Sequence, residues 1–160
     1  MQAQIEQSDV VLAGFHGGSM AGSALADLLF GEASPSGRLP VTWPVHDGQI
    51  PIYYNHKNTG RPPNPNTFVP IDAIPVEAVK TSLGHAAQYL DIGYKPAFPF
   101  GYGLTYTTFD YRDLKLSAEH IPHGGSLEAS ATITNTGSRE ATEVVQLYVR
   151  DLVGEVTRPV

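Results

Sequence analysis

The stretch that decides the fold reads Asp9-Val10-Val11-Leu12-Ala13-Gly14-Phe15, then Gly17-Gly18-Ser19, then Met20 to Phe30. A short apolar run that ends among glycines is typical of a strand buried on both faces of a parallel sheet. Within 20–30 the apolar positions recur at helical spacing along one face, so the pattern predicts a helix there. We expect Ser19 to cap the start of this helix and Gly31 to end it.

The chain then turns at 34–37 and enters a short extended segment, Arg38 to Trp43. Pro40 and Pro44 bias this segment to a sheet edge or an irregular strand. A strand, a helix and a second strand in succession imply a parallel α/β layer, which two strands and one helix cannot close alone. Residues 1–48 therefore predict a partial α/β layer.

Residues 49–107 have weak periodicity and many chain breakers, so we expect an irregular linker there. Residues 49–54 look extended, and the polar, proline-rich run 55–66 follows. A loop of this length is functional, disordered or draped over another domain. We expect one or two helical turns at 76–83, and then a segment, 98–106, dense in aromatic residues and glycines.

Residues 108–160 switch to an alternation of period 2, which is typical of half-buried antiparallel strands. We expect strands at 109–116, 127–133 and 143–150, with a turn at 135–138. Three such strands look like the opening of a β-sandwich, which typically needs about seven. The predicted fold class is thus α/β followed by all-β. Because the last strand would present an open edge, we also expect a homo-oligomer or poor solubility.

Composition excludes several classes of protein. The 160 residues carry a net charge of −6, and the ten basic residues are scattered, so nucleic-acid binding has no electrostatic support. There is no cysteine, which excludes disulfides and thiolate metal sites. No apolar run is long enough to span a membrane. Met1 to Glu6 lacks the basic and apolar parts of a signal peptide, so we expect none in this chain.

Several longer motifs carry a resemblance. The chain contains Leu25-Ala26-Asp27-Leu28-Leu29-Phe30-Gly31, then Pro35-Ser36-Gly37-Arg38-Leu39-Pro40-Val41-Thr42, then Ile50 to Pro62, then Phe100 to Phe109. In this order they resemble the second domain of glycoside hydrolase family 3, above all β-glucosidases of the periplasmic type. Residues 134–137 and 144–148 look like the fibronectin type III-like domain that follows it in many members.

The resemblance implies a parent enzyme with a (β/α)8-like barrel, an α/β sandwich and the fibronectin-like domain. On that basis, residues 1–48 end the α/β sandwich, 49–107 are the loop that closes it, and 108–160 begin an incomplete fibronectin-like sandwich. Family members hydrolyse glycosides with retention, using a nucleophilic Asp in the barrel and an acid/base Glu. The sequence motif around the nucleophilic Asp and the motif around the acid/base Glu cannot be matched to any position of this chain. No catalytic residue is therefore assigned, and no cofactor is implied. A parent in the periplasm or secreted is expected.

Two catalytic readings of the chain's own residues stay weak. Ser19 sits where a serine-hydrolase nucleophile elbow would lie, with Asp47 and His56 or His85 as partners, but a helix cap explains Ser19 better. Retaining glycosidases need two carboxyl groups about 5–5.5 Å apart. Nothing in the sequence pins Asp27 to Glu32, and Asp91 reads as a turn residue before a glycine.

A sugar-binding surface is the remaining candidate site. The substrate-binding candidates are His16, Tyr54, His56, Arg61 and Tyr102. His56 and Arg61 lie in a polar loop that could bind sugar hydroxyls, and the tyrosines, with Tyr53 and Phe100, could stack on a sugar ring. His16 lies in the 14–20 loop, which departs from the Trp-x-Pro-Gly-like run of many relatives. The alternative, which we favour, is that loop and rings pack between domains. No histidine spacing suggests a metal site.

Overall fold

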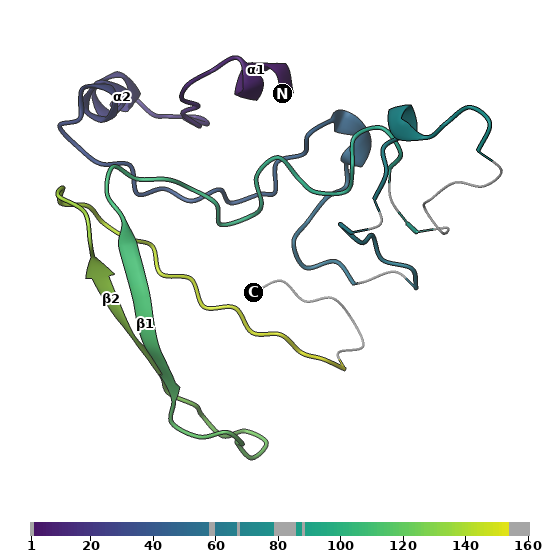
Figure 1. The fold of residues 1–160 in the computed structure, drawn as a ribbon. Coiled ribbons are helices and arrows are strands. Elements are labelled where there is room, and N and C mark those ends of the chain that lie inside the picture. Colours follow the sequence, from purple (N-terminus) through teal and green to yellow (C-terminus); the bar gives the residue numbers. More distant parts are fainter. Residues whose placement is uncertain (1, 58–59, 67, 79–85, 88, 154–160) are drawn as a thin grey trace. The chain divides into compact units, whose positions relative to one another are not determined.

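The computed structural model describes residues 2–57, 60–66, 68–78, 86–87 and 89–153, traced in Figure 1. These residues form two compact units. The first takes its residues from 1–13, 38–102 and 146–160, and the second from 14–37 and 103–145. Each unit is therefore built from segments that are distant in the sequence.

In the second unit, the predicted helix is confirmed as α2 (Ala21–Phe30), and Gly31 ends it with a φ of 77°. That left-handed conformation suits glycine because it has no Cβ. The predicted Ser19 cap is wrong. The residue before the helix is Met20, with no side-chain cap, and the helix start is held by a hydrogen bond of 3.0 Å from the Ala21 N–H to the Gly18 carbonyl.

The strand predicted at 9–15 does not form. This run has no strand pairing, and Val10 and Phe15 expose 77% and 60% of their surface. A strand buried on both faces needs a hydrogen-bonded neighbour and a covering layer on each side. The described residues supply neither, so the apolar run stays exposed and forms no parallel pairing within the described residues.

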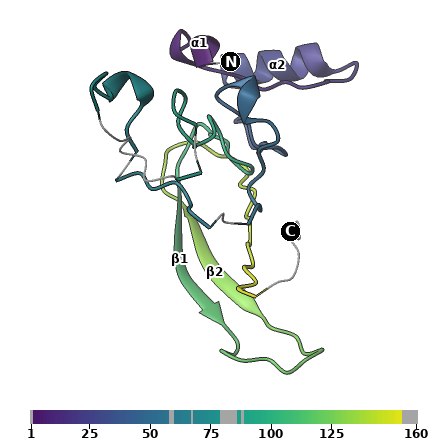
Figure 2. The same cartoon turned by 90° about the vertical axis from the view of Figure 1, so that its right-hand side faces the viewer.

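The second unit also contains a two-stranded antiparallel sheet, β1 (Phe109–Leu116) and β2 (Ala129–Asn135). Figure 2 shows the two strands side by side. The register pairs Phe109 with Asn135 and Leu116 with Ala129, and shifts between Arg112 and Lys115. Asp113, with a φ of 56°, lies in this β-bulge. The two predicted strands are confirmed.

The third predicted strand, 143–150, is wrong: the described structure has no strand there. The predicted turn at 135–138 does form, and the Asn135 side chain organises it. The Asn135 Oδ1 accepts hydrogen bonds from the Gly137 N–H (3.1 Å) and the Thr107 hydroxyl (2.7 Å). The Asn135 Nδ2 donates to the Arg139 carbonyl (2.8 Å). A single amide side chain thus replaces several backbone bonds of the turn.

In the first unit, the extended segment after Arg38 pairs with residues 98–102. The Leu39 N–H donates to the Tyr102 carbonyl and the Gly101 N–H donates to the Leu39 carbonyl, both at 2.8 Å. Trp43 and Phe98 form an antiparallel bridge. The segment is an irregular, proline-interrupted pairing, as predicted, but its partner is the aromatic and glycine-rich run and not a parallel strand.

The other elements of the first unit are short. They are α1 (Gln2–Glu6) and two 3-10 turns, η1 (Asp47–Gln49) and η2 (Ile71–Ala73). The buried Gln49 holds its surroundings together: its Oε1 accepts from the Val45 N–H (2.7 Å) and its Nε2 donates to the Lys95 carbonyl (3.2 Å). The helix expected at 76–83 lies mostly outside the described residues, and its first residues form a turn.

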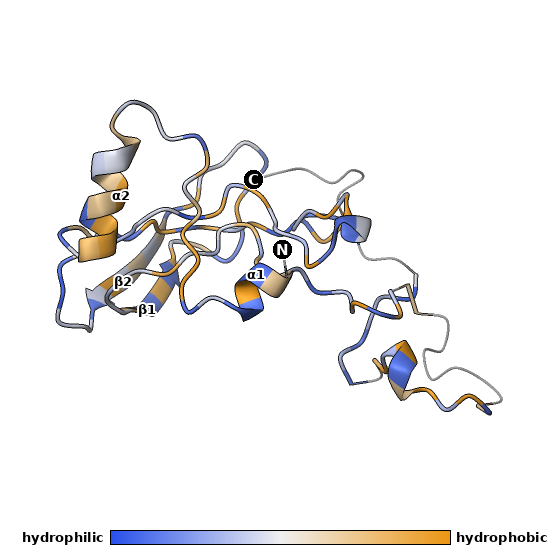
Figure 3. Ribbon diagram, turned by 90° about the horizontal axis from the view of Figure 1, so that it is seen from above, coloured by the Kyte–Doolittle hydropathy of each residue, from blue (hydrophilic) through white to orange (hydrophobic). Residues whose placement is uncertain are grey.

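Apolar side chains are more exposed than buried. Among the described residues only Leu39 and Gln49 are buried, whereas Phe30 at the end of α2 is 85% exposed. Figure 3 marks the hydrophobic positions along α2 and the two strands. Most large apolar side chains of the described residues are therefore open to solvent.

Candidate functional site

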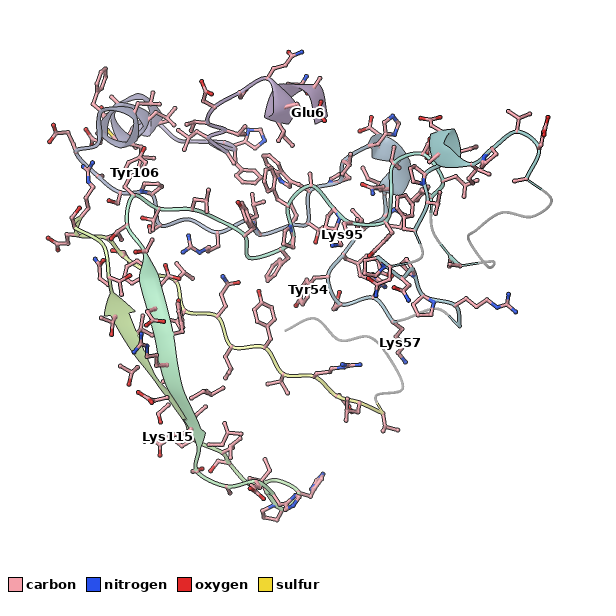
Figure 4. All side chains as sticks on the ribbon, in the orientation of Figure 1. Glu6, Tyr54, Lys57, Lys95, Tyr106 and Lys115 are labelled. Atoms are coloured by element: carbon pink, nitrogen blue, oxygen red, sulfur yellow. The ribbon has the colours of Figure 1, made fainter. Side chains whose placement is uncertain are left out.

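Three rings of the first unit form an aromatic cluster, made of Tyr54, Phe100 and Tyr148. The Tyr54 and Phe100 rings stack with centroids 4.5 Å apart and planes 21° apart. Tyr148 meets both edge-on, at 6.0 Å from Tyr54 and 6.5 Å from Phe100. Such offset-stacked and edge-to-face arrangements are those that aromatic quadrupoles favour. Figure 4 labels Tyr54 among the side chains.

A glycine makes the approach of Tyr148 possible. Gly101 has a φ of 77°, and a Cβ there would lie 2.1 Å from the Gln146 Oε1 and 2.6 Å from the Tyr148 hydroxyl. In the space left by the missing side chain, the Gln146 Nε2 donates to the Gly101 carbonyl (2.9 Å). The Tyr148 hydroxyl donates to the Gln146 Oε1 (2.6 Å). Residues 146–148 are thus seated on Gly101.

A second group of rings lies along the paired segments 38–43 and 98–102. The Phe98 and Tyr102 rings stack at 4.9 Å with planes 25° apart, and Trp43 meets Phe98 edge-on at 6.2 Å. The candidate Tyr102 is 38% exposed, so part of its surface remains open. In both groups, a candidate tyrosine has one ring face against another ring.

Two of the polar candidates, His56 and Arg61, lie in the first unit and are exposed. The His56 ring meets Tyr53 edge-on at 5.9 Å, and its Nδ1 lies 3.1 Å from the Lys57 carbonyl. The Arg61 carbonyl accepts a hydrogen bond of 2.8 Å from the Ala87 N–H. Tyr54, His56, Arg61 and Tyr102 therefore share one unit. His16 belongs to the other unit, where it is exposed in the bend before α2.

The weaker catalytic readings gain no support from the geometry. A nucleophile elbow needs a strand that leads into the helix, and residues 2–18 contain no strand. Asp27 and Glu32 are exposed, at and just after the end of α2, and Asp91 is exposed as well. His85, considered as a partner of Ser19, lies outside the described residues.

Sequence reasoning missed the ring of Tyr148 and the side chain of Gln146. Both were assigned to an alternating strand, and their partner, Gly101, is 45 residues from Gln146. The alternation of residue types along 145–149 could have indicated these two contacts. In Val145-Gln146-Leu147-Tyr148-Val149 the polar and aromatic members share one side of an extended chain, which marks that side as the one with a partner.

The second unit contains an open hollow of about 430 Å³, lined by residues 31–34 and 139–142. The Ser34 hydroxyl donates to the Glu140 carbonyl (3.1 Å) across it. Within the described residues, no group of three or more His, Asp or Glu side chains could hold a metal ion. A search of the same residues for a helix long and apolar enough to cross a membrane found none.

A comparison with protein families decides the assignment. The Glycosyl hydrolase family 3 C-terminal domain matches residues 1–106. The chain belongs to glycosyl hydrolase family 3. The match includes the segments 25–31, 35–42 and 50–62 and confirms the resemblance to family 3, whereas residues 134–137 and 144–148 lie outside it. It ends at Tyr106, shortly before β1 begins.

Relatives of this family 3 chain support the same assignment. It is 41% identical over 155 residues to the periplasmic beta-glucosidase of Salmonella typhimurium, covering 97% of this chain and 18% of the relative. It is 36% identical to a putative beta-xylosidase of Formosa agariphila, covering 96% of this chain and 17% of that protein. The chain thus spans less than a fifth of the length of these curated relatives.

Solved structures of family 3 enzymes resemble the fold. A beta-glucosidase from Listeria innocua in complex with isofagomine gives a TM-score of 0.70 at 37% identity, covering 87% of this chain and 18% of that one. The same enzyme in complex with glucose gives a TM-score of 0.67 over the same share of this chain and 17% of that one. The chain therefore resembles a part of these solved enzymes that makes up less than a fifth of each.

Proposed function

We propose that this chain forms the C-terminal part of a β-glucosidase-type enzyme, which releases terminal β-linked glucosyl residues with retention. The alignment with a periplasmic beta-glucosidase over 97% of the chain carries the proposal. Such an enzyme serves carbohydrate catabolism from the periplasm or outside the cell. The family's nucleophile and acid/base belong to segments that this chain does not match, so the chain alone hydrolyses no glycoside and needs the barrel domain as its partner.

In this proposal, residues 1–48 complete the α/β sandwich, 49–107 close it, and 108–160 begin the fibronectin type III-like sandwich. The family match that ends at Tyr106 supports the last boundary, because β1 starts at Phe109. The antiparallel pairing of β1 with β2 supports the all-β character of the third segment. Antiparallel strand pairs are the building unit of such sandwiches.

The candidate substrate-binding residues divide into two kinds. His56 and Arg61 are exposed polar side chains of one loop, which suits hydrogen bonding to sugar hydroxyls. Tyr54 and Tyr102 stack on Phe100 and Phe98, which favours a packing role for these rings over a sugar platform. For His16, exposure alone supports a place at the substrate.

We also propose that the isolated chain associates with itself through residues 144–149. This run is Val-Val-Gln-Leu-Tyr-Val, without charge, proline or glycine, and the described structure has no strand pairing there. Leu147 and Val149 are 65% and 78% exposed. Apolar runs of high β-propensity with free edges pair with other chains.

A segment exchange tests the enzymatic proposal. The aligned part of this chain would replace the matching segment of the Salmonella typhimurium periplasmic beta-glucosidase, with which it shares 41% identity over 155 residues. We expect the chimera to hydrolyse 4-nitrophenyl β-glucoside faster than the β-xyloside. A folded chimera that prefers the xyloside, or that cleaves neither, would contradict the β-glucosidase assignment.

The chain alone is the matched control. It should release no nitrophenol from either glycoside, and titration with glucose, cellobiose or laminarin should give no saturable signal. Saturable binding without hydrolysis would instead favour an alternative function, that of a non-catalytic carbohydrate-binding or scaffolding module derived from the family. Hydrolysis that disappears on mutation of one of its own carboxylates would overturn the proposal that catalysis lies elsewhere.

A further inference from the structure

The C-terminal end of α2 is closed by side chains from far along the chain. The last carbonyls of a helix have no partner within it. Here the Leu28 carbonyl accepts the Gly31 N–H (3.2 Å) and also the Tyr106 hydroxyl (2.7 Å). The Gly31 carbonyl accepts a hydrogen bond from the Arg139 guanidinium. These two side chains lie 78 and 108 residues from the carbonyls that they bind.

The two side chains also contact each other. The guanidinium carbon of Arg139 lies 5.5 Å from the centroid of the Tyr106 ring, a cation–π distance. Its positive charge stands at the negative end of the helix dipole, where a cation is stabilising. Figure 4 labels Tyr106 beside α2, and its hydrogen bond to Leu28 places the hydroxyl at the last turn. Charge, ring and hydroxyl therefore act on the same turn of helix.

The position of Arg139 depends on the sheet. Its carbonyl accepts the hydrogen bond from the Asn135 Nδ2, and Asn135 is the last residue of β2, paired with Phe109 of β1. The Thr136 N–H donates to the Thr108 carbonyl at 2.8 Å, which fixes the same turn to the start of β1. The turn that carries Arg139 is thus fixed to the end of β2 and to the start of β1.

We propose that Arg139 and Tyr106 form a clamp that couples the last turn of α2 to the β1–β2 sheet. When the sheet opens, the clamp releases the Leu28 and Gly31 carbonyls, and the last helical turn frays with it. The clamp joins residues on both sides of Tyr106, where the family match ends. Residues 14–37 and 103–145 thus behave as one cooperative unit, a conclusion that is independent of the proposed enzymatic function.

Amide hydrogen exchange on the 160-residue chain tests the clamp. In Arg139→Ala, we expect the amides of residues 28–33 to exchange about five- to tenfold faster, because losing a helix cap shifts local opening by about that factor. In Tyr106→Phe, which removes one hydroxyl and keeps the ring, we expect about threefold. Arg112→Ala is the matched control, because Arg112 is an exposed arginine of the same unit that pairs with Asp110.

The exchange rates of these variants distinguish a clamp that couples α2 to the sheet from a contact that has no effect on either element. Exchange at 28–33 within twofold of the unmodified chain in both Arg139→Ala and Tyr106→Phe would overturn it, as would an equal rise in Arg112→Ala. Coupling must also be reciprocal. Ala26→Pro, which breaks α2, should therefore speed exchange of the Thr136 and Gly137 amides, and no change at these two amides would show that helix and sheet open independently.

Discussion

At the scale of single residues, Gly101 is the position where one added methyl group has the largest predictable effect. Its φ of 77° strains any L residue, and a Cβ would meet the Gln146 and Tyr148 side chains. We expect Gly101→Ala to lower the free energy of unfolding by about 2–3 kcal/mol, from left-handed strain plus one lost hydrogen bond. Urea unfolding followed by the fluorescence of Trp43, the chain's single tryptophan, measures it.

Gly37→Ala is the control for this prediction. A Cβ at Gly37 meets nothing within 4 Å, and its φ lies outside the left-handed region. Its free energy of unfolding should stay within about 0.5 kcal/mol of that of the unmodified chain. Equal free energies of unfolding for Gly101→Ala and Gly37→Ala would mean that residues 146–148 do not rest on Gly101.

Individual residues were also where sequence reasoning was least reliable. Ser19 has the residue type and place of a helix cap, yet backbone bonds of the preceding turn start α2 instead. The burial of Gln49 follows from three partners, Val45, His46 and Lys95, one of them 46 residues away. A partner as distant as Lys95 leaves no local pattern around Gln49, because the path of the chain brings the two residues together.

At the scale of elements, α2 contains a glycine whose replacement by alanine should stabilise the fold, in contrast to Gly101. Gly22 lies in the first turn of the helix, and a Cβ there meets nothing within 4 Å. We expect Gly22→Ala to stabilise the helix by about 0.5–1 kcal/mol, because alanine loses less backbone entropy on folding. The measurement is amide exchange of residues 24–28, which should slow by about threefold.

Gly18→Ala serves as the matched control for the helix. Gly18 also has open space, but it precedes α2 and gains no helical propensity from the added methyl group. Its effect on exchange in α2 should remain below about twofold. If both substitutions slowed exchange equally, the gain would come from the unfolded chain and not from the helix.

Elements could be predicted from sequence where their pattern is local. The 3.6-residue period defined α2, and the alternation defined β1 and β2, because these periods follow from the residue's own neighbours. The runs 9–15 and 143–150 have equally good strand patterns and do not pair. A strand exists only with a partner, and the described residues supply none for these two runs. The pairing of 38–43 with 98–102 was missed for the same non-local reason.

At the scale of the whole molecule, the family could be inferred from linear motifs, while the substrate could not. Segments such as 35–42 lie within the residues that match the family. Relatives of similar identity carry different names, a thermostable beta-glucosidase B at 36% and a putative beta-xylosidase also at 36%. Overall similarity to this chain therefore does not distinguish a relative named for glucosides from one named for xylosides.

The exposed run 144–149 should govern how the isolated chain behaves in solution. We expect Leu147→Lys to raise the concentration at which the chain associates by about tenfold, since a charge at the centre of an apolar run opposes strand pairing between copies. Leu147 is 65% exposed, so the lysine costs the folded chain little. Sedimentation velocity over a range of protein concentrations gives the distribution of monomer and larger species.

Leu104→Lys distinguishes association by strand pairing through residues 144–149 from association through exposed apolar surface in general. Leu104 is 72% exposed, comparable to Leu147, but it lies outside the 144–149 run. If association depends on pairing through that run, Leu104→Lys should leave the concentration dependence unchanged, because it removes the same apolar surface without interrupting a strand. An equal shift for both variants would attribute association to exposed apolar area in general, and an unmodified chain that stays monomeric at every concentration would refute self-pairing altogether.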